Sequence, residues 1–197
     1  GTLAIGITVY APMNYYDDNG KLIGFDTEFA EAVCEKLGVK PEFTVIDWET
    51  KEVELKAKNI DCIWNGFTIR EDLKESIDFS KPYCKNMQVA VIKAENSGKY
   101  TDLASLAKAN IVAEAGSSGE SAVADCEELK ECNYVGVSKM ADALLEVKAG
   151  TADAAVVDYV MAKAMVGDGT DYSDLQIVDG IELAYEEYGI GFRKGSN

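Results

Sequence analysis

The stretch VELKAKNIDCIWNGFTIREDLKESIDFS, residues 53–80, decides the fold class. It opens with the end of a polar-faced helix, continues into a buried apolar strand at residues 61–64, and is followed directly by Asn65, Gly66, Phe67 and Thr68. Arg70 is predicted to open a short helical turn. Ligands of open α/β sheets bind outside the carboxyl ends of the strands, where backbone amides and small polar side chains converge. The stretch therefore predicts an α/β fold with a candidate ligand site at residues 65–68.

A second copy of this arrangement occurs later in the chain. In the first copy Asp61 begins an apolar strand that closes on Asn65, and in the second Asp153 begins one that closes on Asp158. A Lys-Ala pair lies one helical turn before each of the two aspartates. The echo predicts two related α/β halves with a site between them. The alternative is that such helix-strand units are simply common.

Composition and charge exclude several functions. The chain has 197 residues, of which 47% are hydrophobic and 27% charged, and it contains no apolar run as long as a membrane span. The net charge of −16 and the lack of a basic stripe argue against nucleic acid as a partner. Histidine is absent, which excludes a histidine base, a histidine metal ligand and a Ser-His or Cys-His dyad. We expect neither a cofactor nor a metal site.

The five cysteines predict no redox or zinc motif, because no Cys-x-x-Cys pair is present. Cys34 and Cys62 are predicted as small core residues. Cys126 and Cys132 flank a short helical stretch, and either a local disulfide or two free thiols fits this spacing.

Helix boundaries follow from capping residues. Asp26 is predicted as the N-cap of a helix that ends at Leu37 and stops at Gly38, and Ser138 as the N-cap of a later helix. Trp48 lies at the start of a helix and is read either as a core residue or as an aromatic wall of a cleft. The polar stretch 93–99 is predicted as a crossing between lobes.

The small-residue turn 116–119 leads into another helix. Its backbone amides carry the positive end of the helix dipole, which suits a carboxylate or phosphate, and the alternative is a plain N-cap. Asp158 follows its strand and heads a helix, so it is either an N-cap or a carboxylate that binds an ammonium group.

These motifs, in this order, resemble the extracytoplasmic solute-binding proteins of polar amino-acid ABC transporters. The segments that carry the resemblance cover essentially the whole chain and are Tyr10-Ala11-Pro12, Gly24-Phe25-Asp26, residues 61–69, Asp78-Phe79-Ser80, Pro82-Tyr83, residues 115–119, Val157-Asp158 and Tyr188-Gly189-Ile190-Gly191. The resemblance implies a periplasmic-binding-protein-like fold of type II, with two Rossmann-like lobes joined by two crossings. Its lobes would be residues 1–90 plus 186–197 and residues 91–185, closing on the ligand like a trap.

The resemblance also implies roles for matching residues. Tyr10 and Trp48 match the aromatic residues that sandwich the ligand side chain. Gly66 and Thr68 match groups that receive the ligand α-amino and α-carboxylate groups. Ser118 matches a donor to the carboxylate, and Asp158 matches the carboxylate that pairs with the α-ammonium group. The predicted ligand-binding set is Tyr10, Trp48, Asn65, Gly66, Phe67, Thr68, Arg70, Ser117, Ser118 and Asp158.

The chain departs from the family pattern at Leu73, where the family usually has an arginine that binds the α-carboxylate. Arg70 lies three residues earlier and shares a face with Leu73 in a helical turn, so we hypothesise that Arg70 takes over this role. Alternatively, the ligand lacks a free carboxylate or is anchored by amides alone. The resemblance also implies that Glu114 is a neighbour of the side-chain pocket, where it would favour a cationic ligand if it faces that pocket. The family also usually continues with further helices beyond residue 193.

The resemblance implies a monomeric, non-enzymatic component of an ABC importer that captures a polar amino acid outside the cell and presents it to a membrane permease. Its location would be periplasmic or at the cell surface, with a lipid anchor as one option and with its signal peptide removed. Two alternatives remain: a sensory domain of a membrane receptor, and a dehydratase-like enzyme on the same fold with Asp158 or Glu114 as its base.

Overall fold

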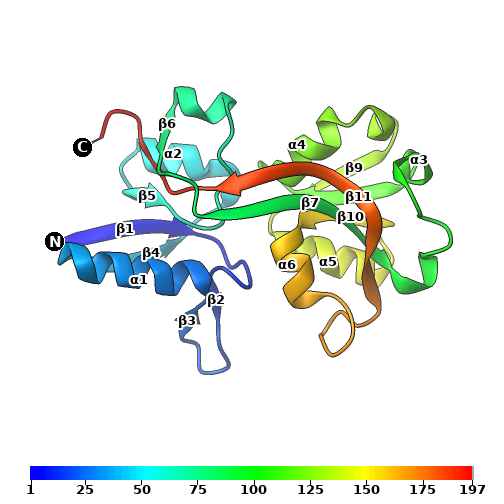
Figure 1. The fold of residues 1–197 in the computed structure, drawn as a ribbon, viewed down its shortest axis with the longest axis horizontal. Coiled ribbons are helices and arrows are strands. Elements are labelled where there is room, and N and C mark those ends of the chain that lie inside the picture. Colours follow the sequence, from blue (N-terminus) through cyan, green and yellow to red (C-terminus); the bar gives the residue numbers. More distant parts are fainter. Residues whose placement is uncertain (197) are drawn as a thin grey trace. The chain divides into compact units, whose positions relative to one another are not determined.

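The computed structural model describes residues 1–196, and its chain contacts divide it into two compact units. Unit 1 comprises Gly1–Lys85 and Glu186–Asn197, and unit 2 comprises Asn86–Tyr185. The chain passes from unit 1 to unit 2 within one long strand and returns within another (Figure 1). The stretch 93–99, predicted as a crossing, lies instead inside unit 2, because the strand before it already belongs mostly to that unit.

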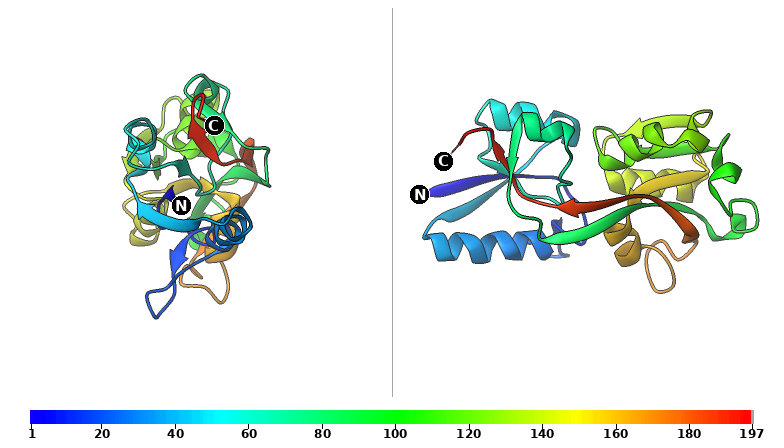
Figure 2. Two further views of the ribbon diagram at one scale, coloured as in Figure 1. Left: turned by 90° about the vertical axis from the view of Figure 1, so that its left-hand side faces the viewer. Right: turned by 45° about the horizontal axis from the view of Figure 1, so that its top comes forward.

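Unit 1 is an α/β unit around a five-stranded sheet in the order β4-β1-β5-β12-β6. Its elements are β1 (Thr2–Ile7), β2 (Tyr15–Tyr16), β3 (Leu22–Ile23), α1 (Phe25–Leu37), β4 (Lys40–Val45), η1 (Trp48–Thr50), α2 (Lys51–Lys56), β5 (Cys62–Ile63), η2 (Asp72–Glu75), β6 (Ile77–Phe79) and β12 (Gly191–Arg193). Strands β4, β1 and β5 are parallel, and β12 pairs antiparallel with both β5 and β6. Helix α1 lies along this sheet (Figure 2).

Unit 2 repeats this plan with the sheet order β11-β7-β10-β8-β9. Its elements are β7 (Cys84–Lys93), η3 (Ala94–Asn96), α3 (Leu103–Leu106), β8 (Asn110–Glu114), α4 (Ser118–Asp125), η4 (Glu127–Leu129), β9 (Asn133–Val137), α5 (Met140–Ala149), β10 (Ala154–Asp158), α6 (Tyr159–Met165) and β11 (Leu175–Tyr188). Strands β9, β8 and β10 are parallel, and β7 is antiparallel to β10. Three parallel strands followed by an antiparallel one therefore occur in both units, and the sequence echo predicts two related α/β halves without specifying these strand directions.

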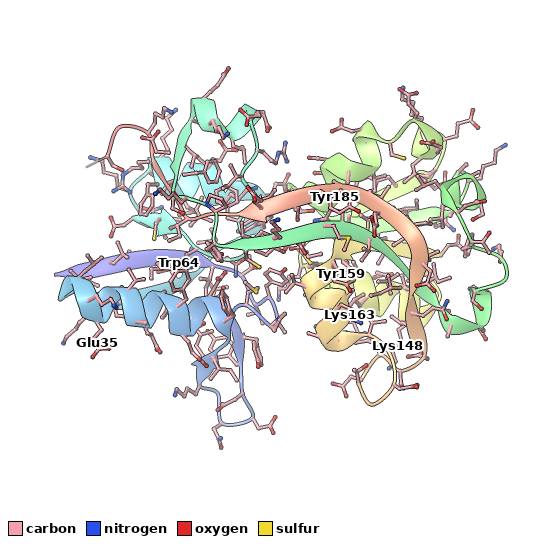
Figure 3. The ribbon with its side chains drawn as sticks, viewed as in Figure 1. Glu35, Trp64, Lys148, Tyr159, Lys163 and Tyr185 are labelled. Carbon is pink, nitrogen blue, oxygen red and sulfur yellow. The ribbon has the colours of Figure 1, made fainter. Side chains whose placement is uncertain are left out.

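Apolar side chains form the core on both sides of the unit 1 sheet. Ile5, Ile7 and Cys62 pack with Cys34 of α1 on one side. The indole of Trp64 packs edge-on against Phe29 of α1, with ring centroids 5.1 Å apart, and Figure 3 shows it beside that helix. In unit 2 the buried side chains of β7, β8 and β10 form a separate core.

Glycine terminates two helices, at Gly38 as predicted and also at Gly150, since both adopt left-handed conformations at the C-caps of α1 and α5. The N-cap predictions at Asp26 and Ser138 are wrong. Helix α1 is capped by Gly24 and α5 by Lys139, neither with a side-chain cap hydrogen bond. Asp26 is instead buried in the first turn of α1.

All five cysteines are free thiols in the structure. Of the two alternatives for Cys126 and Cys132, the structure therefore shows two free thiols and no disulfide. Cys34 and Cys62 are buried, as predicted. Within residues 1–196 the helices are too short or too polar to cross a bilayer.

Candidate functional site

The turn that follows β5 is fixed by Asn65. Its Oδ1 accepts a hydrogen bond from the Thr8 hydroxyl at 2.7 Å. Its Nδ2 donates to the Thr8 carbonyl at 3.0 Å and to Asn14 Oδ1 at 2.7 Å. Because all of these groups are buried, Asn65 ties the turn to the loop after β1. The side chain thus has a structural role within unit 1.

Gly66 is a site of close approach. Its φ of 56° lies in the left-handed region, and a Cβ added there would lie 2.6 Å from Cε1 of Tyr10. Only glycine fits this position without strain. The Gly66 amide donates a hydrogen bond of 2.7 Å to Oδ2 of Asp26.

Asp26 is fully buried and links three segments of unit 1. Besides the Gly66 amide, its Oδ2 accepts a hydrogen bond from the Tyr83 hydroxyl at 2.9 Å. Burial, the largest influence, raises the pKa of Asp26 to about 6, although the Gly66 amide, the Tyr83 hydroxyl and the Trp64 indole act in the opposite direction. Asp26 is therefore a carboxyl group that titrates in mildly acidic solution.

Trp48 and Phe67 are in direct contact, with ring centroids 5.4 Å apart and planes nearly perpendicular. Phe67 also packs against Phe79 at 5.0 Å. Leu73 joins the same buried cluster. Leu73, where the resemblance implies an arginine, is thus part of an apolar core.

Tyr10 and Thr68 both reach Tyr188, which belongs to the returning segment of unit 1. The hydroxyls of Tyr10 and Tyr188 are 2.8 Å apart, and Thr68 forms a β-bridge with Tyr188. All three residues are buried. The structure therefore brings Tyr10, Gly66 and Thr68 together around one tyrosine.

Arg70 lies nearer the surface of unit 1. Its Nε and one terminal nitrogen donate to the two carboxylate oxygens of Asp72 at 3.0 Å and 2.7 Å. The Arg70 side chain is 31% exposed and the Asp72 side chain 60% exposed, so solvent screens this ion pair.

In unit 2, Ser117 is the N-cap of α4, and its hydroxyl accepts a hydrogen bond from the Glu120 amide at 3.2 Å. Glu120 in turn accepts the Gly116 amide at 2.7 Å and the Tyr134 hydroxyl at 3.1 Å. Ser118 is the first residue of α4. Ser117 is thus an N-cap whose hydroxyl is engaged with its own helix.

Asp158 ends β10 and is buried. It accepts a hydrogen bond from Nε2 of Gln88, a fully buried residue of β7. A Cβ added at Gly119 would lie 3.1 Å from Oε1 of Gln88 and 3.3 Å from the Ser117 hydroxyl. Asp158, Gln88 and the start of α4 therefore form one polar cluster within unit 2. Glu114, also buried, ends the neighbouring strand β8.

A cavity of about 560 Å³ in unit 1 lies elsewhere. Its lining residues are Glu52, Val53, Leu55, Lys56, Ser76, Ile77, Arg193 and Lys194. None of them belongs to the predicted ligand-binding set. Among residues 1–196 there is no group of three or more His, Cys, Asp or Glu side chains placed to hold a metal ion.

Three functional candidates were not predicted from the sequence in these roles: Asp26, Gln88 and Tyr188. The signal for Asp26 was present in the Gly24-Phe25-Asp26 segment, but a helix-start aspartate reads first as an N-cap. Gln88 and Tyr188 lie in long apolar or mixed strands. Strand alternation alone does not distinguish them from packing residues.

The model of the bacterial extracellular solute-binding proteins, family 3, matches residues 3–196. The chain belongs to this family. The L-cystine-binding protein TcyJ of Escherichia coli (strain K12) is 29% identical over 202 residues, covering 100% of this chain and 72% of TcyJ. The family is extracellular and consists of solute-binding proteins.

Solved structures agree with the assignment. An ancestral arginine-binding protein bound to arginine superposes with a TM-score of 0.91 at 34% identity, covering 100% of this chain and 86% of that one. The ancestral amino acid-binding protein AncCDT-1, a precursor of cyclohexadienyl dehydratase, superposes with a TM-score of 0.88 at 31% identity, covering 99% and 83%. The predicted α/β fold of the periplasmic-binding-protein type is confirmed.

Proposed function

We propose that this family 3 protein binds a polar amino acid and delivers it to the permease of an ABC importer, as a monomer and without catalysing a reaction. The observation that carries the proposal is the whole-chain similarity to an ancestral protein described as arginine-binding. The polar groups at the strand ends of each unit supply chemistry that suits an amino acid.

In unit 1 the proposed ligand groups are the Gly66 carbonyl and the Thr68 hydroxyl. The Gly66 amide donates to Asp26, so the carbonyl is the group that Gly66 offers to an ammonium ion. Tyr10, Trp48 and Phe67 supply aromatic surface, and Asn65 holds the turn in place. Arg70 is proposed as the carboxylate anchor, because exchanging its exposed partner Asp72 for a ligand costs little free energy.

In unit 2 the proposed groups are the Asp158 carboxylate for the α-ammonium group and the backbone amides and Ser118 hydroxyl at the start of α4 for the α-carboxylate. Ser117 supports them as the N-cap. Gln88 orients Asp158. Charge-assisted hydrogen bonds of this kind discriminate strongly between amino acids and neutral solutes.

The test is a thermal-shift screen against the twenty amino acids and L-cystine, followed by isothermal titration of each hit. A ligand at about a hundred times its Kd adds roughly 2.7 kcal/mol of stability. Asp158→Asn should abolish the shift, whereas Asp125→Asn, at an exposed position of the same unit, should leave it unchanged. A full shift in Asp158→Asn would contradict the proposed role of Asp158, and silence across the panel would contradict the proposed function.

An enzyme is the second candidate, because AncCDT-1 is described as a dehydratase precursor. Asp158 and Glu114 are the buried carboxylates of unit 2 that such chemistry would use as a base. We propose binding alone. Mass spectrometry of any hit after long incubation with the protein should find the ligand unchanged, and a product lacking water would favour the enzyme.

A further inference from the structure

Asp26 connects the proposed ligand turn with the start of the strand that leads out of unit 1. Both of its hydrogen bonds converge on one oxygen, Oδ2, which accepts from the Gly66 amide at 2.7 Å and from the Tyr83 hydroxyl at 2.9 Å. The donors come from segments far apart in sequence, and Asp26 itself belongs to α1. One buried carboxylate thus holds three segments in register.

The Gly66 side of this link controls the ligand turn. A Cβ at Gly66 would meet Tyr10 at 2.6 Å and Tyr188 at 3.2 Å, so the turn is closely packed against these two rings. The amide orientation that Asp26 fixes also sets the direction of the preceding peptide plane, because the peptide group is rigid. Any change in the hold on this amide therefore changes the turn.

The hydrogen bond from Tyr83 to Asp26 lies at the point where the chain leaves unit 1. Tyr83 immediately precedes β7, and its amide donates to the Tyr188 carbonyl at 2.9 Å. Its ring packs against Phe29 at 5.5 Å and Tyr188 at 6.4 Å. Tyr83 therefore contacts Tyr188, which Tyr10 and Thr68 also contact.

The titratable groups that face Asp26 are Tyr83 and Cys84. Burial, followed by the charge of Asp26, raises the pKa of both. The remaining polar groups around the carboxyl are the neutral Gly66 amide and Trp64 indole. Asp26 is the member of this group that changes charge in mildly acidic solution, since its pKa is raised to about 6.

We propose that Asp26 is a positioning residue that fixes the ligand turn through Gly66 and the exit strand through Tyr83, and that protonation of Asp26 loosens both. The proton adds to Oδ1, so Oδ2 changes from a carboxylate to a carbonyl oxygen. Charge-assisted hydrogen bonds are roughly twice as strong as neutral ones, so both donors are then held less firmly. The consequence for ligand affinity rests on the proposed function, whereas the coupling to Gly66 does not.

The decisive measurement is the ¹⁵N–¹H chemical shift of the Gly66 amide between pH 4.5 and 8, without ligand. We expect a single titration with a midpoint near 6. Asp26→Asn should flatten the curve. Tyr83→Phe should keep the titration and move its midpoint upward, because the Tyr83 hydroxyl lowers the pKa of Asp26. Asp153→Asn, which removes a backbone-bonded carboxylate of unit 2, should leave the curve unchanged.

A flat Gly66 curve in the wild-type protein, or a curve unchanged in Asp26→Asn, would overturn the proposal. If Asp26→Asn does not fold, the midpoint in Tyr83→Phe decides, since an unmoved midpoint would assign the titration of the Gly66 amide to a group other than Asp26 and overturn the proposal.

A second arm uses L-arginine as the probe, titrated calorimetrically at pH 7.5 and 5.0. If only the ionised form of Asp26 binds tightly, the Kd rises by about tenfold at pH 5.0 in the wild type. It should rise by less than about twofold in Asp26→Asn. Equal changes in both proteins would overturn the link to affinity. Failure of every amino acid to bind at either pH would refute the proposed function, and the Gly66 titration would still decide the positioning role.

Discussion

The carboxylate of Asp61 accepts a hydrogen bond from the backbone amide of Ala4 at 2.9 Å, and Asp153 does the same for Asn110 at 2.9 Å. In each unit, therefore, the aspartate before one strand binds the first residues of the neighbouring parallel strand. The repeated sequence pattern around Asp61 and Asp153 thus corresponds to one hydrogen bond that occurs in both units. The two aspartates align equivalent strands in two α/β units.

Replacing either aspartate by alanine should destabilise its unit. Each aspartate has a second partner: Asp61 accepts from Arg193 at 3.2 Å, and Asp153, which is less exposed, accepts the Tyr100 hydroxyl at 2.6 Å. We expect a loss of about 2 kcal/mol for Asp153→Ala and about 1 kcal/mol for Asp61→Ala, measured by urea unfolding. Asp168→Ala, at an exposed position, is the control and should cost less than about 0.5 kcal/mol. If both variants lose no more free energy of unfolding than Asp168→Ala does, the two aspartates do not stabilise their units.

Gly66 should tolerate no side chain, because two costs combine there. A left-handed backbone costs a non-glycine residue about 1 kcal/mol, and the added Cβ would also lie 2.6 Å from Tyr10. We expect Gly66→Ala to lower the free energy of unfolding by about 3 kcal/mol.

Gly20 is the matched control, since its φ is 76° and a Cβ there meets no atom within 4 Å. Gly20→Ala should cost only about 1 kcal/mol. Equal costs at the two positions would mean that the Tyr10 contact relaxes freely.

Much of the fold followed from local pattern. Apolar strands and the left-handed glycine at Gly38 are set by neighbours in sequence. Such features depend on period and on backbone chemistry, so one chain is enough to predict them.

The candidate site was harder to predict from the sequence, because the roles of its side chains depend on hydrogen-bond partners that are far away in sequence. Asp26 looked like a helix cap, yet its carboxylate is engaged by Gly66 and Tyr83. Asn65 looked like a ligand group, yet its side chain is engaged by Thr8 and Asn14. Long-range hydrogen bonds of this kind leave no periodic trace in the sequence.

Asp26 should also make stability depend on pH. Its pKa is about 6 in the folded protein against an ordinary 3.8, so the folded state binds more protons between these values. The free energy of unfolding therefore falls as the pH rises through this window, by about 3 kcal/mol in total. The reason is that burying the charged carboxylate costs more free energy than the hydrogen bonds to it contribute. Asp26→Asn removes the titration. From pH 4.5 to 7.5 the wild type should lose about 2 kcal/mol relative to Asp26→Asn in urea unfolding.

Asp153→Asn serves as the control for this pH dependence. The pKa of Asp153 is lowered: burial raises it, but hydrogen bonds from Tyr100 and the Asn110 amide and the charge of Lys99 outweigh burial. Its contribution to stability is lost only as the pH falls below about 3.8. The difference between wild type and Asp153→Asn should therefore stay constant from pH 4.5 to 7.5. A constant difference for Asp26→Asn as well would contradict the raised pKa of Asp26.

Arg70 provides the sharpest test of how the ligand is anchored. Leu73, where the resemblance implies an arginine, lies in the apolar cluster of Trp48 and Phe67. Arg70 is the nearby guanidinium, and its bond to the exposed Asp72 is worth less than about 1 kcal/mol, so a ligand carboxylate can replace it. We expect Arg70→Met to weaken binding of the best-bound amino acid by tenfold or more, a loss of about 1.4 kcal/mol, in isothermal titration.

Lys74→Met is the matched control, because Lys74 is a cation of the same segment, paired with exposed Glu71. It should change the affinity by less than about twofold, since it removes the same charge at long range without a proposed ligand contact. Equal losses in both variants would indicate general electrostatic attraction rather than a specific anchor. Unchanged affinity in Arg70→Met would mean that the ligand carboxylate is bound by the amides at the start of α4, or that the ligand has no free carboxylate.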